Sequence, residues 1–240
     1  DRLLFCCFRQ KTGKNRKLFL FYKFWRVYLH PYQSDWIMDQ KERIIEQAMH
    51  MFVSQGIKSV RMDDIAQQLG VSKRTLYELF GDKEGLFSAL VAPVAGALKE
   101  MFLDIQERFH NFDASVQEQE MGNYTQTQQM AMLDYIYDHF EIFQILLEGA
   151  EGTRFAHFVD ELVEIEVDYT YKYMAVIGCE SVKRGIVTEE FIHIIVTAYF
   201  NGMFEVVRHE MTKEAAIKYI RLLNRYHMKG FETVFDAAGV

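Results

Sequence analysis

The segment from Met62 to Tyr77, MDDIAQQLGVSKRTLY, decides how this chain folds. With Gly70 as the turn of a helix-turn-helix, its apolar residues fall where two short crossed helices need inward side chains. Gly70 can adopt the left-handed conformation that ends the first helix, and Ser72 can cap the second. Ala66 lies where the two helices would approach most closely. The predicted inward positions are Ile65, Leu69, Val71, Leu76 and Leu79.

The outward side of the second helix carries polar groups that suit phosphates or base edges, with Glu78 as the exception. A solvated surface helix would also be polar there. The buried positions match the motif independently of these residues, however, which favours DNA contact. The predicted contacts are Ser72, Lys73, Arg74, Thr75 and Tyr77.

The flanking residues fit the same unit. Ile44, Ala48 and Phe52 recur every four residues on a helix that Gly56 should end. After the second helix, Asp82 is a good N-cap for a further helix, which we expect to run to about residue 109. Lys83 in its first turn suits a phosphate contact, helped by the amide groups of that helix end.

This order of residues resembles the TetR family of transcriptional regulators over roughly residues 40–90. The resemblance implies a homodimer, a three-helix DNA-binding head and a variable helical body that senses a small molecule. By family position, the five outward residues would face DNA and Lys83 would contact its backbone. The matching features are Gly56, Asp64-Ile65-Ala66, Gly70-Val71-Ser72, Thr75, Leu76-Tyr77, Phe80, Lys83-Glu84 and Leu86.

One position departs from the family pattern. Many members place a threonine where this chain has Arg61. The N-cap of the first helix of the motif is then weaker, but the guanidinium could itself reach a phosphate.

Composition predicts an all-α protein with its acidity away from the DNA-binding segment. Half of the residues are hydrophobic, there are two prolines, and the net charge is −7. Residues 1–37 carry eight basic against two acidic residues, residues 38–90 seven against eight, and residues 91–240 twelve against twenty-four. Acidity in the last part would keep DNA off the wrong face. Three cysteines without a paired framework suit a reducing cytoplasm.

We expect three regions. Residues 1–37 form a basic and aromatic extension that is not part of the fold; a start at Met38, an arm along DNA and a membrane-surface segment remain open for it. No signal peptide or bilayer-spanning run is evident in that extension. Residues 38–85 form the helix-turn-helix domain, and residues 86–240 form an effector-binding and dimerisation domain.

The body should consist of helices near residues 123–138, 139–148, 154–177, 188–209 and 213–236, with residues 110–122 as a loop or frayed helix end. Pro93 should bend or divide the helix that follows Asp82. The last two helices are apolar on more than one face, which predicts a four-helix interface between two copies.

Aromatic residues of the body are helical core by default, but a few should line an effector pocket. We select Tyr135, Phe158, Tyr169, Tyr173 and Tyr199. His157 and Glu161 lie one turn apart, yet two ligands do not make a metal site, so we expect no metal and no cofactor.

Enzyme signatures are absent: the chain has no dinucleotide-binding glycine motif, P-loop or nucleophile elbow. We therefore expect a cytoplasmic, effector-released repressor that binds a pseudo-palindromic operator in double-stranded DNA, with no membrane partner. A helical protein-interaction module without effector control and an enzyme in the acidic body are the alternatives.

Overall fold

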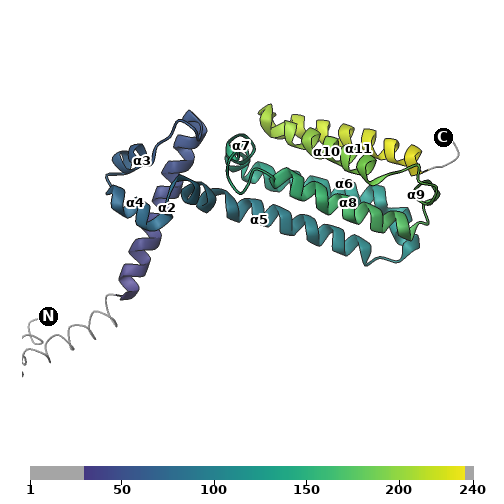
Figure 1. Cartoon of the computed structure of the whole chain (residues 1–240), viewed down its shortest axis with the longest axis horizontal. Coiled ribbons are helices and arrows are strands. Elements are labelled where there is room, and N and C mark those ends of the chain that lie inside the picture. Colours follow the sequence, from purple (N-terminus) through teal and green to yellow (C-terminus); the bar gives the residue numbers. More distant parts are fainter. Residues whose placement is uncertain (1–29, 236–240) are drawn as a thin grey trace, which may run out of the picture. The chain divides into compact units, whose positions relative to one another are not determined.

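The computed structural model describes the backbone of residues 30–235 and the side chains of residues 40–234, and all regular secondary structure in that part is helical. By its internal contacts the chain divides into residues 1–47 and 48–240, with the division inside α2. The helices are α2 (His30–Gln55), α3 (Met62–Leu69), α4 (Lys73–Phe80), α5 (Lys83–His110), α6 (Ala114–Asp138), α7 (Phe140–Gly149), α8 (Phe158–Val176), α9 (Glu180–Lys183), α10 (Glu189–Arg208) and α11 (Lys213–Phe235) (Figure 1).

Helices α3 and α4 form the predicted helix-turn-helix. Gly70 has φ +65° and ψ +24°, and the Val71 N–H donates to the Ala66 carbonyl over 3.0 Å. This closes α3 in the way a left-handed glycine permits. The Ser72 Oγ accepts a 3.0 Å hydrogen bond from the Thr75 N–H and so caps α4. Both predicted helix boundaries are confirmed.

The inward positions hold the two helices together. Ile65 and Leu76 are fully buried, and Ala66 is buried at the position of close approach. The other three predicted inward residues, Leu69, Val71 and Leu79, are only partly buried. Three well-buried side chains therefore suffice for the α3–α4 contact, because both helices are only two turns long.

Gly85 permits the tight start of α5. The Asp82 Oδ1 accepts a 2.7 Å hydrogen bond from the Gly85 N–H, as expected for an N-cap. A Cβ atom at Gly85 would lie 1.9 Å from the Phe80 carbonyl oxygen, so any side chain there would displace backbone. The chain can therefore pass from α4 into α5 within two residues only because residue 85 is glycine.

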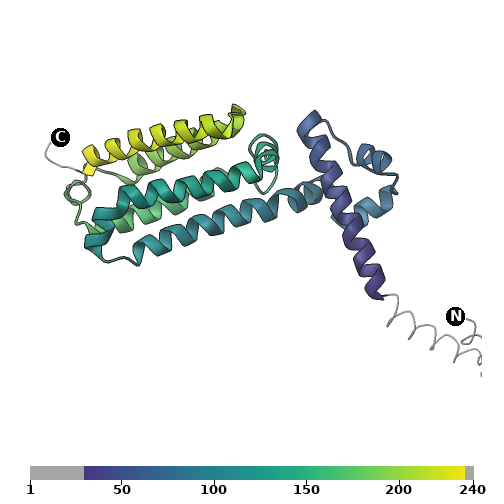
Figure 2. The same ribbon diagram turned by 180° about the vertical axis from the view of Figure 1, so that it is seen from behind.

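The body is a bundle in which α5, α6, α8, α10 and α11 run alongside one another (Figures 1 and 2). Helix α10 packs against α7, α8 and α11, and α5 packs against α6, α7 and α8. Phe143, Phe200 and Phe204 are fully buried in its core. Helices α5 and α10 are long and apolar enough to cross a membrane by length and composition, but their apolar residues belong to this core.

Two expectations about helix breaks are wrong. Residues 114–122 are helical, since α6 begins at Ala114. Gln117 makes this possible: it is buried, and its amide donates to the carbonyl oxygens of His110 and Phe112 at the end of α5. Pro93 does not divide α5, because buried residues on both sides of it keep the helix in the core.

The predicted region boundaries fall inside helices. Helix α2 begins at His30, eight residues before Met38, and α5 continues across residue 85. Residues 1–29 lie outside the described part, so the division into an extension, a head and a body stays a prediction.

Candidate functional site

The outward side of α4 presents the polar groups that the sequence predicts. Ser72, Lys73 and Arg74 are exposed, and Thr75 is partly buried. The phenol of Tyr77 is a large exposed aromatic group, with 47% of the residue accessible. All five side chains therefore stand on one short, capped helix that is fixed to the core by Leu76 and Phe80.

Acidic neighbours hold the two cations of this helix. The Lys73 Nζ lies 2.6 Å from the Asp63 Oδ2, and the Arg74 Nε lies 2.7 Å from the Glu78 Oε1. The hydrogen bond from Lys73 holds the pKa of Asp63 below its usual value, with a smaller contribution from Arg61. A phosphate that bound these cations would replace one exposed anionic partner by another.

Arg61 and Lys83 differ in their availability. Arg61 begins α3 without a side-chain cap, and the Asp64 carboxylate accepts a 3.2 Å hydrogen bond from its backbone N–H. Its side chain is 75% exposed and lies 3.7 Å from Asp63. The Lys83 Nζ instead donates to the Lys58 carbonyl over 3.3 Å, and burial lowers the pKa of Lys83. Lys83 would have to turn outward to reach a phosphate.

A cavity of about 110 Å³ lies in the body between α5, α6, α8, α10 and α11. Of the five aromatic residues selected from the sequence, Tyr169, Tyr173 and Tyr199 line it. Tyr135 does not, and its hydroxyl donates to the Val94 carbonyl over 3.3 Å. Phe158 packs in the core against Phe204, with ring centroids 6.0 Å apart. The structure thus brings together three of the five.

Polar residues of this cavity were not selected from the sequence. Glu166 accepts a 2.6 Å hydrogen bond from the Gln106 Nε2, and Gln129 and His227 also line the wall. One signal was available: Glu166, Tyr169 and Tyr173 are three and four residues apart, which puts them on one face of a helix. The other two come from distant helices, and no local pattern marks them.

Two contacts join the start of α5 to the segment before α8. The Arg154 backbone N–H donates to the Glu84 carboxylate over 3.2 Å, and its guanidinium bonds the Ser88 hydroxyl. The rings of Phe87 and Phe155 pack edge to face at 5.9 Å. Further along, α5 lines the cavity with Phe102 and other residues. One helix therefore connects the cavity wall with the helix-turn-helix.

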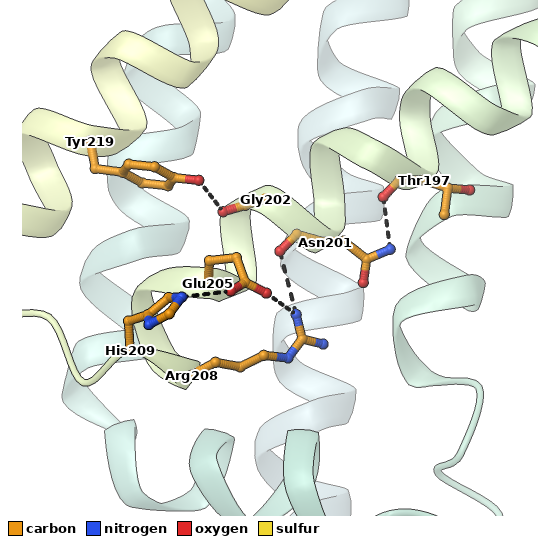
Figure 3. Close-up of polar contacts among 7 residues, drawn as sticks. All are labelled: Thr197, Asn201, Gly202, Glu205, Arg208, His209 and Tyr219. Atoms are coloured by element: carbon orange, nitrogen blue, oxygen red, sulfur yellow. Dashed lines mark hydrogen bonds and ion pairs between the residues drawn. The ribbon is translucent and has the colours of Figure 1, made fainter.

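The last two helices approach closely and leave an apolar face uncovered. The Tyr219 hydroxyl donates to the Gly202 carbonyl over 2.9 Å, in the group of polar contacts that Figure 3 shows. A Cβ at Gly202 would already touch Leu223 at 3.4 Å. The exposed apolar residues of α10 and α11, with their accessible fractions, are Phe191 (40%), Ile194 (64%), Leu222 (66%) and Tyr226 (76%).

The pair considered for a metal has other partners. The His157 Nδ1 lies 2.9 Å from the Asp160 carboxylate, and Glu161 pairs with Lys99 at 2.6 Å. Within the described side chains no three His, Cys, Asp or Glu residues gather as a metal-binding group.

Comparisons with known proteins agree with this geometry. The family model described as "Bacterial regulatory proteins, tetR family" matches residues 44–90. The chain is 25% identical over 194 residues to the HTH-type transcriptional regulator SAR2658 of Staphylococcus aureus, covering 78% of this chain and 92% of that protein. It is 30% identical over 78 residues to the HTH-type transcriptional regulator AcrR of Shigella flexneri, covering 32% of this chain and 36% of AcrR.

Solved structures show the same fold. The ketosteroid transcriptional regulator KstR2 of Mycobacterium tuberculosis is similar with a TM-score of 0.53 at 16% identity, covering 77% of this chain and 93% of that one. At this identity the likeness concerns the fold alone.

Proposed function

Because this chain belongs to the TetR family of DNA-binding transcriptional regulators, we propose that it is a homodimeric cytoplasmic repressor that a small apolar or amphipathic effector releases from its operator. The observation that carries the proposal is the capped helix α4, which presents Ser72, Lys73, Arg74, Thr75 and Tyr77 on one exposed side. Arg61 and, after rotation, Lys83 would add phosphate contacts beside it.

Two copies of α4 would enter successive major grooves of a pseudo-palindromic site, about 34 Å apart or slightly more. The proposal is tested by titrating the full chain with DNA from upstream of its own gene at several salt concentrations. Lys73→Ala with Arg74→Ala should weaken binding and reduce the salt slope by about two, one for each lost phosphate contact.

The matched control removes the same charge elsewhere. Lys183→Ala with Arg184→Ala, at the end of α9, should leave both the affinity and the salt slope unchanged. If the α4 variant kept the wild-type slope, the two cations would not contact phosphates. An unaltered affinity as well would reject DNA binding through α4.

The uncovered apolar face of α10 and α11 is our proposed dimer interface. Side chains as exposed as Ile194 and Leu222 cost little in a monomer but become favourable when a second copy covers them. Ile194→Glu should shift the chain from dimer to monomer in sedimentation. Val176→Glu, an equally drastic change of an exposed apolar residue outside this face, should leave the dimer intact.

For release, the effector would bind the body cavity and shift α5, which continues from the cavity to Asp82 beside the helix-turn-helix. The effector must favour a spacing of the two α4 helices that does not match DNA, with a typical coupling of about 1–3 kcal/mol. A screen for compounds that lower operator affinity tests this step. If compounds bound the cavity without altering operator affinity, the protein would be a constitutive binder.

A further inference from the structure

The body cavity contains a carboxyl group that has no cationic partner. The Gln106 amide is the one group in the described part of the chain that hydrogen-bonds to Glu166, and neither lysine nor arginine lines the cavity. An amide donor satisfies a lone pair of the carboxylate but does not cancel its charge. A negative charge at Glu166 is therefore left uncompensated by the protein.

Further hydrogen-bond acceptors belong to the same part of the cavity. The Gln129 Oε1 and the His227 Nε2 are buried without a hydrogen-bond partner among the described residues. Tyr199 connects them: its hydroxyl accepts from the Gln129 Nε2, and its ring centroid lies 4.5 Å from that of His227. Burial, together with the charge of Glu166, raises the pKa of Tyr199, so Glu166 also lies close to this group.

The protonation states make this end a set of acceptors. Burial lowers the pKa of His227 to about 4, so its imidazole is neutral near pH 7 and can accept a hydrogen bond. Burial also raises the pKa of Glu166 to about 7, because nothing nearby compensates the charged form. A bound cation would reverse this cost and favour the carboxylate.

Resting on the proposed function, we propose that the effector is a compact organic amine, bound as its ammonium ion by Glu166, Gln129 and His227. A primary ammonium offers three donors and no acceptor, which complements this set. The aromatic rings of Tyr169, Tyr173 and Tyr199 line the same cavity and favour a cation. A volume of about 110 Å³ suits one ring or a short chain, since a cavity of about 150 Å³ holds benzene.

The other titratable groups around Glu166 do not oppose this. On α5, both ring nitrogens of His110 face carbonyl oxygens, that of Gln106 at 2.9 Å and that of Tyr169 at 3.1 Å, so neither is directed to a ligand. On α6 and α8, burial raises the pKa of Tyr124 and Tyr173 as it does for Tyr199 on α10, so these hydroxyls stay neutral near pH 8.

The test is calorimetric titration of the full chain, without DNA, with three probes of similar shape: 2-phenylethylamine, 2-phenylethanol and phenylacetate. At pH 8 the amine should bind at least about tenfold more tightly than the alcohol, and phenylacetate most weakly. Amine affinity should rise from pH 6 to pH 8, by up to about tenfold per unit below the pKa of Glu166, because the carboxylate must be ionised.

Glu166→Gln should remove both the preference for the amine and its pH dependence. The matched control is Glu164→Gln, which makes the same charge change on the exposed side of α8 and should behave like wild type. The probe comparison and the pH series use the wild-type chain, so the test does not depend on the folding of the variant.

Three results would overturn the inference: absence of amine binding, an alcohol or carboxylate that binds as tightly as the amine, or an affinity that falls as the pH rises. The last would mean that protonated Glu166 donates to a neutral ligand. In each case a non-cationic compound that binds and releases DNA would leave the proposed function standing. Conversely, amine binding without any effect on operator affinity would reject the proposed release mechanism but not this ligand class.

Discussion

The helix-turn-helix and the body place their charges in opposite ways. On α4, Lys73 and Arg74 are exposed, and each is paired with an acidic residue at most ten positions away in the sequence. In the body cavity, Glu166 has only an amide partner, Gln106, from a different helix sixty residues earlier. The first arrangement is local and open to solvent, whereas the second is non-local and enclosed.

This difference bears on how each region can select a partner. Exposed ion pairs contribute little to stability, so a phosphate can replace Asp63 at Lys73 with small cost. A carboxylate that has lost its water is selective instead, because an unsuitable ligand leaves it unpaired. The helix-turn-helix is thus suited to a polyanion of many sequences, and the cavity to one narrow class of ligand.

The sharpest way to break the comparison is to remove the local geometry of the helix-turn-helix. In Gly85→Ala, the new Cβ would lie 1.9 Å from the Phe80 carbonyl oxygen, so the α4–α5 junction must shift. We expect a loss of about 2–4 kcal/mol in unfolding free energy and of operator binding, measured by denaturation and DNA titration. Gly96→Ala, in the same helix with nothing within 4 Å, should instead be neutral or stabilising; equal behaviour of the two variants would contradict the steric argument.

The buried charge of the body predicts a pH-dependent stability. Burial raises the pKa of Glu166 from about 4.5 in the unfolded chain to about 7 in the folded one. The folded state therefore binds more protons between these values, and its stability falls as the pH rises from about 4.5 to about 7. Glu166→Gln should exceed wild type in unfolding free energy at pH 8, by at most about 3 kcal/mol, and match it near pH 4.

Urea denaturation at several pH values measures this difference, with Glu164→Gln as the control that should follow wild type. A wild-type chain that gained stability relative to Glu166→Gln between pH 5 and pH 7 would show that the carboxylate is stabilised in the fold.

A contact between the two regions offers a smaller effect. A Cβ on Gly149 would lie 2.7 Å from the Ile57 Cγ2, so Gly149→Ala should overpack this contact and cost about 1–3 kcal/mol. Adding Ile57→Ala removes the clashing atom, and the double variant should therefore be less unstable than the sum of the single changes. A double-mutant cycle in denaturation and in operator affinity measures the coupling; strictly additive effects would exclude it.

The weakest expected effect concerns the exposed pair. Asp63→Asn frees Lys73 and removes a negative charge near the expected phosphates, so operator affinity should rise about twofold to fivefold. Asp104→Asn, which removes an exposed acid paired with Arg108 in the body, serves as the control in the same DNA titration. A decrease in affinity on Asp63→Asn would mean that Asp63 holds Lys73 in its DNA-binding position.

The sequence by itself determined the helix-turn-helix. Its turn at Gly70, its cap at Ser72 and its outward residues depend on neighbours within one or two helical turns, so their spacing is visible in the chain. The same holds for the start of α5 at Asp82. The steric need for Gly85 was not visible, because the opposing oxygen belongs to a backbone turn that only the folded chain defines.

Only the tertiary structure decided which residues of the body share a cavity. The sequence placed Tyr169, Tyr173 and Tyr199 among many equivalent aromatic residues, and it could not separate them from Tyr135 and Phe158. Helical periodicity specifies which face of a helix is buried, but not which helices those faces meet. Glu166, Gln129 and His227 come together through the packing of three helices, so their shared environment and the shifted pKa values follow from the fold and not from local sequence.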